Sequence, residues 1–494
     1  MKAVLHETHL DCYQKSFQNE KVFELTGESV VSDKMPDIGL LGDTNAHVLL
    51  RVKRAESGLA VLEGDLCATV CYLPDGAGGC CSIEITVPWQ AEFLSEDIKD
   101  GATAVGDVRV IQLETRMINP RKVLIKAQIS AEITVYEKES VVVCDNIEDV
   151  SAIQTLQRTV DCSLIGTVCE KTFVATDEYP LSADLYDGKV LCKSAQLRLD
   201  DVKTLANKLI VKGSVLSDVV ITTEQGNMER ISFTSGFSFI AETDCETVSA
   251  DVKAVLMPTA MYYEVTSNGQ MLSVEVHGVC QMTAYRKQVL TYLTDAYSNF
   301  YECKTETKHF PVFTDTKNSS QRETVNISVP VRSQISEILF VNASVGATTH
   351  KDKVIQVPLS VSVCLKYENG TLDWTKKVTT AELKSKETER LLSVRAADLY
   401  SVSNGNEAVI RVTLEADLRE EREVRLEMLT SIETDEEHPY CLVRPLITAV
   451  RRKGSLWEIA REFGSTVELI RQYNQVEEDE VSDQMLLLIP KQIK

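Results

Sequence analysis

The sequence predicts a mainly β protein with three tandem β-sandwich-like domains followed by a small β-α-α-β domain. Three observations lead to this prediction. Short runs rich in Val, Ile, Thr and Leu alternate between apolar and polar residues, which is typical of half-buried strands. One hairpin pattern occurs three times at intervals of roughly 150 residues, a usual domain length. After Ile447 the apolar spacing changes to the three or four residues of a helix.

Each repeat contains two β-rich runs joined by a turn. The runs alternate, as in Leu66-x-Ala68-x-Val70-x-Tyr72, so one set of side chains faces a core. The turns DGAGG, TEQGN and ENGT supply residues that tolerate positive φ. Two further strands around a polar turn are expected after each hairpin. We expect the hairpins at Ala60–Phe93, Leu209–Glu242 and Ile355–Leu383, and the later strand pairs at Arg109–Tyr136, Ser249–Tyr285 and Ala396–Leu418.

Composition suggests where one domain ends and the next begins. Ile147–Gln157 and Lys287–Tyr297 have some helical spacing, so they are candidate helices. The acidic stretch Glu433–Pro439 is typical of a solvated linker. The predicted order is therefore β domains at 1–146, 147–298 and 299–432, the third of them degenerate, an acidic linker at 433–446, and a C-terminal domain at 447–494.

The C-terminal domain has the clearest local signals. Leu456, Ile459, Ala460 and Phe463 share one helical face, with Ser455 as the N-cap and Gly464 as the end. A second helix begins after Ser465 or Thr466 and runs through Tyr473, with Val467, Ile470 and Tyr473 on one face. Strands at Thr448–Val450 and Met485–Ile489 complete the β-α-α-β order.

Charge and cysteine content restrict the partners and the compartment. The formal net charge is -22, and the densest basic run is Arg451-Arg452-Lys453, so we expect no binding to nucleic acid and no insertion into a membrane. The first residues, MKAVLHETHLDCYQ, lack the apolar stretch of a signal peptide, so a soluble intracellular protein is expected. The 14 cysteines contain no C-x-x-C pair and are interpreted as core residues of a reducing compartment. Cys67 and Cys71 are expected on one face of a strand, where a zinc site with Cys80 and Cys81 is a weaker alternative.

We find no sequence pattern that predicts catalysis, a metal site or a cofactor. The seven histidines are isolated from one another and from metal-ligand spacings. The Gly-rich Asp75–Gly79 has no following helix or Lys to hold a phosphate, so a turn is expected. Asn119-Pro120-Arg121-Lys122 is interpreted as a turn between strands, with anion binding as the weaker alternative. A non-enzymatic protein is the prediction, and a hydrolase hidden in a β domain is the least favoured alternative.

The C-terminal domain resembles a LysM domain through Leu456-Trp457-x-Ile459-Ala460, Gly464-x-Thr466, Asn474 and Leu487-x-Ile489-Pro490. The resemblance implies binding of N-acetylglucosamine polymers such as peptidoglycan in a groove between two loops. If the groove is retained, its residues are Gly454, Ser455, Leu456, Asn474, Gln475 and Gln484. The chain departs from the family at both loops: Lys453-Gly454-Ser455-Leu456 lacks the usual Asp, and Asp483-Gln484 replaces the usual Pro-Gly.

Trp457 lies one position away from the core face, and Leu469 replaces a residue that is usually polar in LysM domains. Either both residues belong to the margin of the core, or together they form an exposed apolar patch that binds a protein. On the second interpretation we expect Trp457→Ala or Leu469→Glu to abolish partner binding while the domain stays folded. Lys453, Ser455 and Arg471 complete this candidate partner-binding set.

The whole chain resembles the spore coat assembly proteins of endospore-forming bacteria that carry SPOCS domains. The resemblance rests on several motifs in addition to the order of the domains: Val30–Ile38, Gly64-x-Leu66, Val87-Pro88-Trp89, Asn119–Lys122 and Asp295-Ala296-Tyr297-Ser298. It implies a morphogenetic adaptor in the mother-cell cytoplasm at the forespore surface. Its partners would be other coat proteins and the coat morphogenetic ATPase, which the LysM domain binds. The alternative is a cell-wall or cortex protein that binds peptidoglycan.

Overall fold

The computed structural model describes residues 4–76, 79–148, 153–223, 228–243, 251–266, 268–403, 407–439, 447–482 and 485–491. The prediction of a mainly β protein is confirmed, because strands make up nearly all of the described chain before the two short helices near the C-terminus. Six strands are much longer than the five or six residues of a common strand. They pair as three antiparallel ribbons, each of which brings together the two ends of one unit of the chain.

The first unit contains β1 to β6 and the second contains β7 to β12. Their strands are β1 (Val4–Val30), β2 (Ile38–Glu56), β3 (Leu59–Pro74), β4 (Cys81–Leu94), β5 (Thr103–Asn119), β6 (Lys122–Glu148), β7 (Ile153–Pro180), β8 (Lys189–Leu205), β9 (Lys208–Thr222), β10 (Met228–Glu242), β11 (Asp251–Val265) and β12 (Met271–Ser298). In each unit, three central strands form a sheet, β2-β3-β4 or β8-β9-β10. The last two strands form a second sheet with the first strand, in the order β5-β6-β1 or β11-β12-β7.

The third unit repeats this order from β13 to β19. Its strands are β13 (Tyr301–Pro330), β14 (Ile335–Val345), β15 (Thr349–Lys351), β16 (Val354–Tyr367), β17 (Leu372–Lys384), β18 (Glu389–Ser403) and β19 (Glu407–Pro439). β14, β15 and β17 pair with β16, and β18-β19-β13 form the other sheet. The three predicted hairpins are confirmed as β3–β4, β9–β10 and β16–β17. The later strand pairs are confirmed as β5–β6, β11–β12 and β18–β19.

A separate apolar core fills each unit, because alternate residues of its strands turn inward. The first core contains mainly buried residues from Val31 to Val135, with Met257 and Val279 of the second unit at its margin; the second contains mainly those from Phe173 to Ala284, and the third those from Ile327 to Leu418. Polar side chains then connect every pair of units. These contacts include Gln281 with the backbone of Gly106, Arg419 with Asp251, and Asn342 with Asp43.

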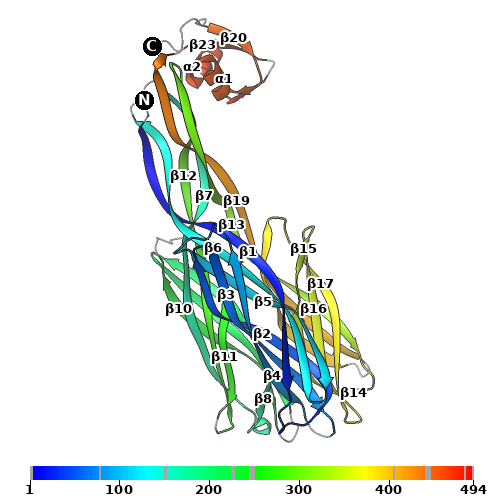
Figure 1. Cartoon of the computed structure of the whole chain (residues 1–494). Coiled ribbons are helices and arrows are strands. Elements are labelled where there is room, and N and C mark those ends of the chain that lie inside the picture. The colour runs from blue at the N-terminus through cyan, green and yellow to red at the C-terminus, as the bar shows by residue number, and fades with distance from the viewer. Residues whose placement is uncertain are drawn as a thin grey trace.

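The long ribbons extend beyond the three cores and converge (Figure 1). Single bridging pairs, Tyr13 with Ile165 and Phe313 with Ser163, join them into one nine-stranded sheet. Beyond this junction, the ribbons carry a small apolar cluster of their own. The C-terminal module, described over residues 447–482 and 485–491, lies at the far end of the ribbons (Figure 1). The ribbons therefore hold the module away from the three cores.

Three of the predicted boundary features are wrong. Lys287–Tyr297 is part of β12, and Ile153–Gln157, the described end of the other candidate helix, begins β7. In β12 a bulge between Leu293 and Asp295 interrupts the alternation, so buried Leu293 and Ala296 have the i, i+3 spacing that suggested a helix. Glu433–Pro439, the first half of the predicted linker, ends β19, and residues 440–446 of that linker lie outside the described residues. Glu433 there pairs with Lys304, and Glu433 and Asp435 lie on the exposed face of a ribbon, where acidic residues are tolerated.

Candidate functional site

The C-terminal module forms the predicted order of elements. It contains β20 (Ile447–Arg451), β21 (Gly454–Ser455), α1 (Leu456–Phe463), α2 (Val467–Asn474), β22 (Glu480–Val481) and β23 (Leu486–Pro490). Ser455 caps α1 by accepting from the backbone N–H of Glu458 at 3.2 Å. Gly464 ends α1 with a φ of 67°, a conformation that glycine adopts without strain. Thr466 caps α2 by accepting from the N–H of Leu469 at 3.1 Å, so Thr466 is the cap of the two candidates.

The module encloses a small core of its own. Leu456, Ile459 and Ala460 of α1 pack with Ile470 of α2, as the spacing predicts. Leu487 and Ile489 of β23 complete the core; the full buried set also includes Val481 and Tyr297. Tyr473 differs from the prediction, because 54% of its surface is exposed. Tyr297 is the one buried member of this core that comes from outside the module, at the end of β12.

Tyr297 and its neighbour Asp295 hold the module on the ribbon. The ring of Tyr297 meets Trp457 edge to face at 4.7 Å, and its hydroxyl donates to the carbonyl of Ser465 at 2.9 Å. Asp295 Oδ2 accepts from Trp457 Nε1 and from Arg461 Nη1, both at 2.8 Å. Burial raises the pKa of Tyr297 far above its ordinary value, so the phenol stays protonated as a donor. We call Asp295, Tyr297, Trp457, Arg461 and Ser465 the docking contact.

The residues predicted to bind a partner lie in different surroundings in the structure. Trp457 is half-buried in the docking contact, so its indole contacts the same chain. Leu469 is half-buried on α2, and Lys453 is exposed before α1. Ser455 is used as a helix cap, and Arg471 pairs with Asp479 in the acidic loop. Of the two interpretations of Trp457, the structure places the indole at the margin of the module core, where Asp295 and Tyr297 contact it, and binding of a partner at this residue stays a prediction.

Most of the predicted groove residues form contacts inside the module. Gly454 and Ser455 pair with Val481 and Glu480, so the two loops that would border a groove are joined by backbone contacts. Leu456 is 1% exposed, and its N–H donates to the carbonyl of Asp479 at 2.7 Å. Gln475 is exposed at the end of α2, whereas Gln484 lies outside the described residues.

Asn474 of the predicted groove supports the edge of β23. Its Nδ2 donates to the carbonyl of Leu488 at 2.6 Å, and its Oδ1 accepts from the N–H of Leu488 at 2.7 Å. Nδ2 also lies 2.7 Å from the carbonyl of Ile470, one turn earlier in α2. The amide thus pairs with Leu488 as a neighbouring strand would, and both of its polar atoms are already used.

An exposed apolar face on β20 and β23 was not identified from the sequence. Ile447, Leu486 and Leu488 are exposed by 53%, 52% and 42%. Register places them on one side of the two-stranded sheet, opposite the buried Leu487 and Ile489. The alternation within Leu486-Leu487-Leu488 was the available signal, because three consecutive leucines in a strand cannot all face one core. We call Ile447, Leu486 and Leu488 the apolar sheet face.

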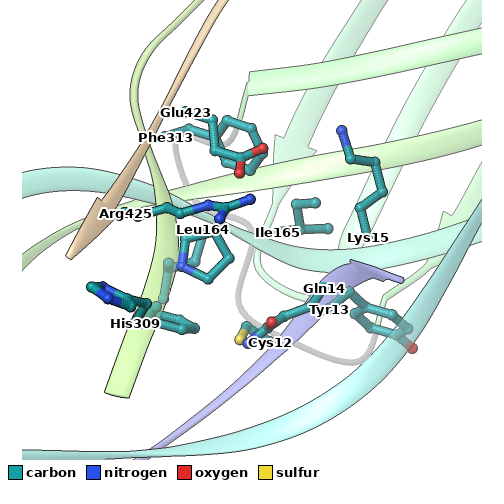
Figure 2. Close-up of a pocket in the computed structure, with 12 residues that line it drawn as sticks. Cys12, Tyr13, Gln14, Lys15, Leu164, Ile165, His309, Phe313, Glu423 and Arg425 are labelled. Atoms are coloured by element: carbon teal, nitrogen blue, oxygen red, sulfur yellow. The ribbon is translucent and has the colours of Figure 1, made fainter. Parts of the chain in front are cut away.

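Two hollows lie between the units. The smaller, of about 470 Å³, lies where the ribbons leave the cores, and Figure 2 shows its lining side chains. Lys15, His309, Glu423 and Arg425 contribute polar groups from three different strands, and burial raises the pKa of the lining thiol Cys12 to about 11. The larger, of about 650 Å³, is lined by all three units.

Arg121 of the predicted turn forms an ion pair and hydrogen bonds within its own chain. Its guanidinium lies 2.6 Å from Asp37 and donates to the carbonyls of Val31 and Ser32 at 3.1 and 3.0 Å. The backbone of Pro120 and Arg121 also accepts from Ile38 and Val31. The turn therefore anchors the segment between β1 and β2, and its cation is paired with Asp37 and these carbonyls.

Within the described part of the chain, no three His, Cys, Asp or Glu side chains are arranged to hold a metal ion. No described helix has both the length and the apolar character needed to cross a bilayer. Comparison of the chain with protein-family models, with curated proteins and with solved structures found no match.

Proposed function

We propose that this protein is a non-enzymatic assembly adaptor of the endospore coat. Its C-terminal module acts as a LysM domain that binds the coat morphogenetic ATPase, and its β units, as SPOCS domains, contact other coat proteins at the forespore surface in the mother-cell cytoplasm. The observation that carries the proposal is the apolar sheet face on a module held at the end of long ribbons.

The exposure of this face supports protein binding. Ile447, Leu486 and Leu488 lie on one side of a strand pair, with Leu488 across from Ala449 and Leu486 across from Arg451, and each of the three is at least 42% exposed in the whole chain. Burying exposed aliphatic side chains against a partner contributes about 25 cal/mol per Å² of apolar surface. The module carries seven basic and eight acidic residues, so little net charge opposes the approach of an acidic or a basic protein.

The geometry of the candidate groove favours a protein ligand over a glycan. Sugar recognition needs polar groups that are free to bind hydroxyls. Both polar atoms of the Asn474 side chain already form hydrogen bonds with the backbone of Leu488 and Ile470, and Leu456 is buried in the core. Backbone pairing of Gly454 with Val481 also joins the two loops that would border the groove. Peptidoglycan binding therefore stays the alternative proposal.

A pull-down of the full chain with the purified coat ATPase tests the proposal. Leu488→Glu places a charge on the apolar sheet face, and we expect at least a tenfold loss of binding, equal to about 1.4 kcal/mol. Val378→Glu is the matched control, because Val378 is 67% exposed on β17, far from the module in sequence. Circular dichroism checks that both variants fold. Equal binding by both variants and the wild type would show that the face does not bind this partner.

Sedimentation with purified peptidoglycan separates the two proposals. The adaptor proposal expects the chain to remain in the supernatant. Co-sedimentation that Gln475→Ala reduces and Leu488→Glu does not would favour the glycan proposal, because Gln475 is the exposed residue among the described groove candidates on α2.

A further inference from the structure

Four buried thiols meet where the three units of the chain contact one another. Cys71 lies on β3, Cys80 directly before β4, Cys192 on β8 and Cys364 on β16. They are 2%, 6%, 8% and 0% exposed, and they belong to one apolar cluster with Leu191, Val220 and Phe340. We call these cysteines the thiol cluster. Its members come from all three units, so a covalent bond within it can join units that are otherwise held by packing and polar contacts.

Cys71 is the central member of the thiol cluster. It shares a buried apolar cluster with Cys192 and Cys80, and these two thiols are the neighbours that raise the pKa of Cys71 most. The two neighbours differ in their surroundings, because Cys80 Sγ also donates to the carbonyl of Tyr72 at 3.4 Å. That contact holds Cys80 on its own hairpin. Cys192 lies on the second unit, so its contact with Cys71 is the one that crosses between units.

We propose that Cys71 and Cys192 form a disulfide when a peroxide oxidises the protein, and that this bond fixes the sheet β2-β3-β4 to the sheet β8-β9-β10. In the first step, Cys71 Sγ attacks one peroxide oxygen, the O–O bond breaks, and Cys71 becomes a sulfenic acid while one water leaves. In the second step, Cys192 Sγ displaces the sulfenic hydroxyl as a second water. The two thiols lose two electrons and two protons, and the peroxide is reduced to two waters.

The surroundings make this reaction slow and its product durable. The neighbouring thiols of Cys192 and Cys80, together with burial, raise the pKa of the Cys71 thiol well above its ordinary value. The thiolate is the reactive form, so little of it exists at neutral pH. The same burial shields a disulfide from a dissolved thiol reductant. The bond is therefore expected to accumulate under lasting exposure to oxidant and to persist afterwards. This inference is independent of the proposed function.

Peptide mapping of the full chain tests the inference. The reduced protein is incubated with hydrogen peroxide, remaining thiols are blocked with N-ethylmaleimide in denaturant, and the unreduced digest is analysed by mass spectrometry. We expect a peptide pair joined through Cys71 and Cys192, lighter by two hydrogen atoms than its reduced components. The thermal midpoint should rise on oxidation, because the bond restricts the unfolded chain. Faster formation at higher pH is also expected.

Matched variants show which thiols form the bond. Cys192→Ser should remove the linked pair and the rise in thermal midpoint, whereas Cys80→Ser should retain both. Circular dichroism verifies that each variant folds. Peptide mapping of the wild-type chain tests the proposal even if a variant does not fold. The proposal is overturned if Cys71 and Cys192 stay fully alkylated after peroxide, or if Cys71 is linked to Cys80 instead.

Discussion

The indole Nε1 of Trp457 donates to Asp295 Oδ2 across 2.8 Å, and this bond joins the C-terminal module to the tip of β12. The same carboxylate oxygen accepts from Arg461, and Tyr297 packs its ring against the indole. Two sequence motifs that were noted separately, Leu456-Trp457 and Asp295-Ala296-Tyr297-Ser298, therefore form one contact. Trp457 is a binding residue whose partner lies in its own chain.

Replacing Asp295 should weaken this contact while leaving the ribbons paired. Asp295→Asn removes the charge that Trp457 and Arg461 share, and we expect a loss of about 1 kcal/mol because the carboxylate is partly exposed. The chain has three tryptophans, so a ¹⁵N-tryptophan-labelled sample should give three indole signals. The signal of Trp457, assigned with Trp457→Phe, should move in Asp295→Asn.

Glu458→Gln is the control for this experiment, since Glu458 is exposed on α1 next to Trp457. It should leave the indole signal of Trp457 almost unchanged. An unchanged Trp457 signal in Asp295→Asn would mean that the module does not dock on β12 in solution.

Asn474 should stabilise the edge of β23 and not a ligand. Asn474→Ala leaves the N–H and carbonyl of Leu488 to water, with a local cost of about 1–2 kcal/mol. Hydrogen–deuterium exchange should therefore accelerate at Leu488 by roughly tenfold. Gln472→Ala, at an exposed position of the same helix, is the control and should not change this exchange. Equal exchange rates at Leu488 in both variants would contradict the edge-pairing role.

The sequence predicted the local structure of this protein well and its tertiary contacts poorly. Alternation and turn residues located all three hairpins, since each depends on neighbours along one strand pair. The cap Ser455 was also located, and the second cap was narrowed to Ser465 or Thr466, because a helix start is a local signal. In β12, the bulge at Leu293 gave a strand the spacing of a helix, so the period alone was misleading.

The candidate site depended on contacts that no local pattern reveals. Trp457 was recognised as a residue outside the helix core, but its partner Asp295 is 162 residues away. The thiol cluster shows the same limit. Cys67 and Cys71 were expected on one face of a strand, and both do pack away from the first core, Cys67 against the second core and Cys71 in the thiol cluster. The sequence gives no sign that Cys192, from another unit, lies beside Cys71.

Gly64 should be required because a side chain there has no space. A Cβ at Gly64 would lie 1.9 Å from the carbonyl oxygen of Leu49 and 2.8 Å from the ring of Trp89, its cross-strand partner. Gly64→Ala should lower the free energy of unfolding by roughly 1–3 kcal/mol, the cost of overpacking. Gly236→Ala is a matched control on β10, where a Cβ would meet nothing within 4 Å. Chemical denaturation followed by circular dichroism measures both variants, and a Gly64→Ala variant as stable as Gly236→Ala would contradict the close approach.

His47 should make the first unit less stable as the pH falls below neutrality. Burial, aided by the nearby Lys193, lowers the pKa of His47 from 6.5 to about 4. Between these two values the unfolded chain binds a proton that the folded chain does not, so stability is complete above pH 6.5 and falls as the pH decreases toward 4. At pH 5 the loss should be about 1–2 kcal/mol, allowing for the partial exposure of the ring.

His47→Gln removes this titration and retains a polar side chain of similar size. The stability difference between His47→Gln and the wild type should therefore shift in favour of the variant by that amount from pH 7.5 to pH 5. Urea denaturation at both pH values measures the shift. His309→Gln is the control for an imidazole that is exposed on β13, and it should show a smaller change with pH. A difference between His47→Gln and the wild type that stays constant with pH would mean that the His47 ring is protonated as readily in the folded protein as in the unfolded chain.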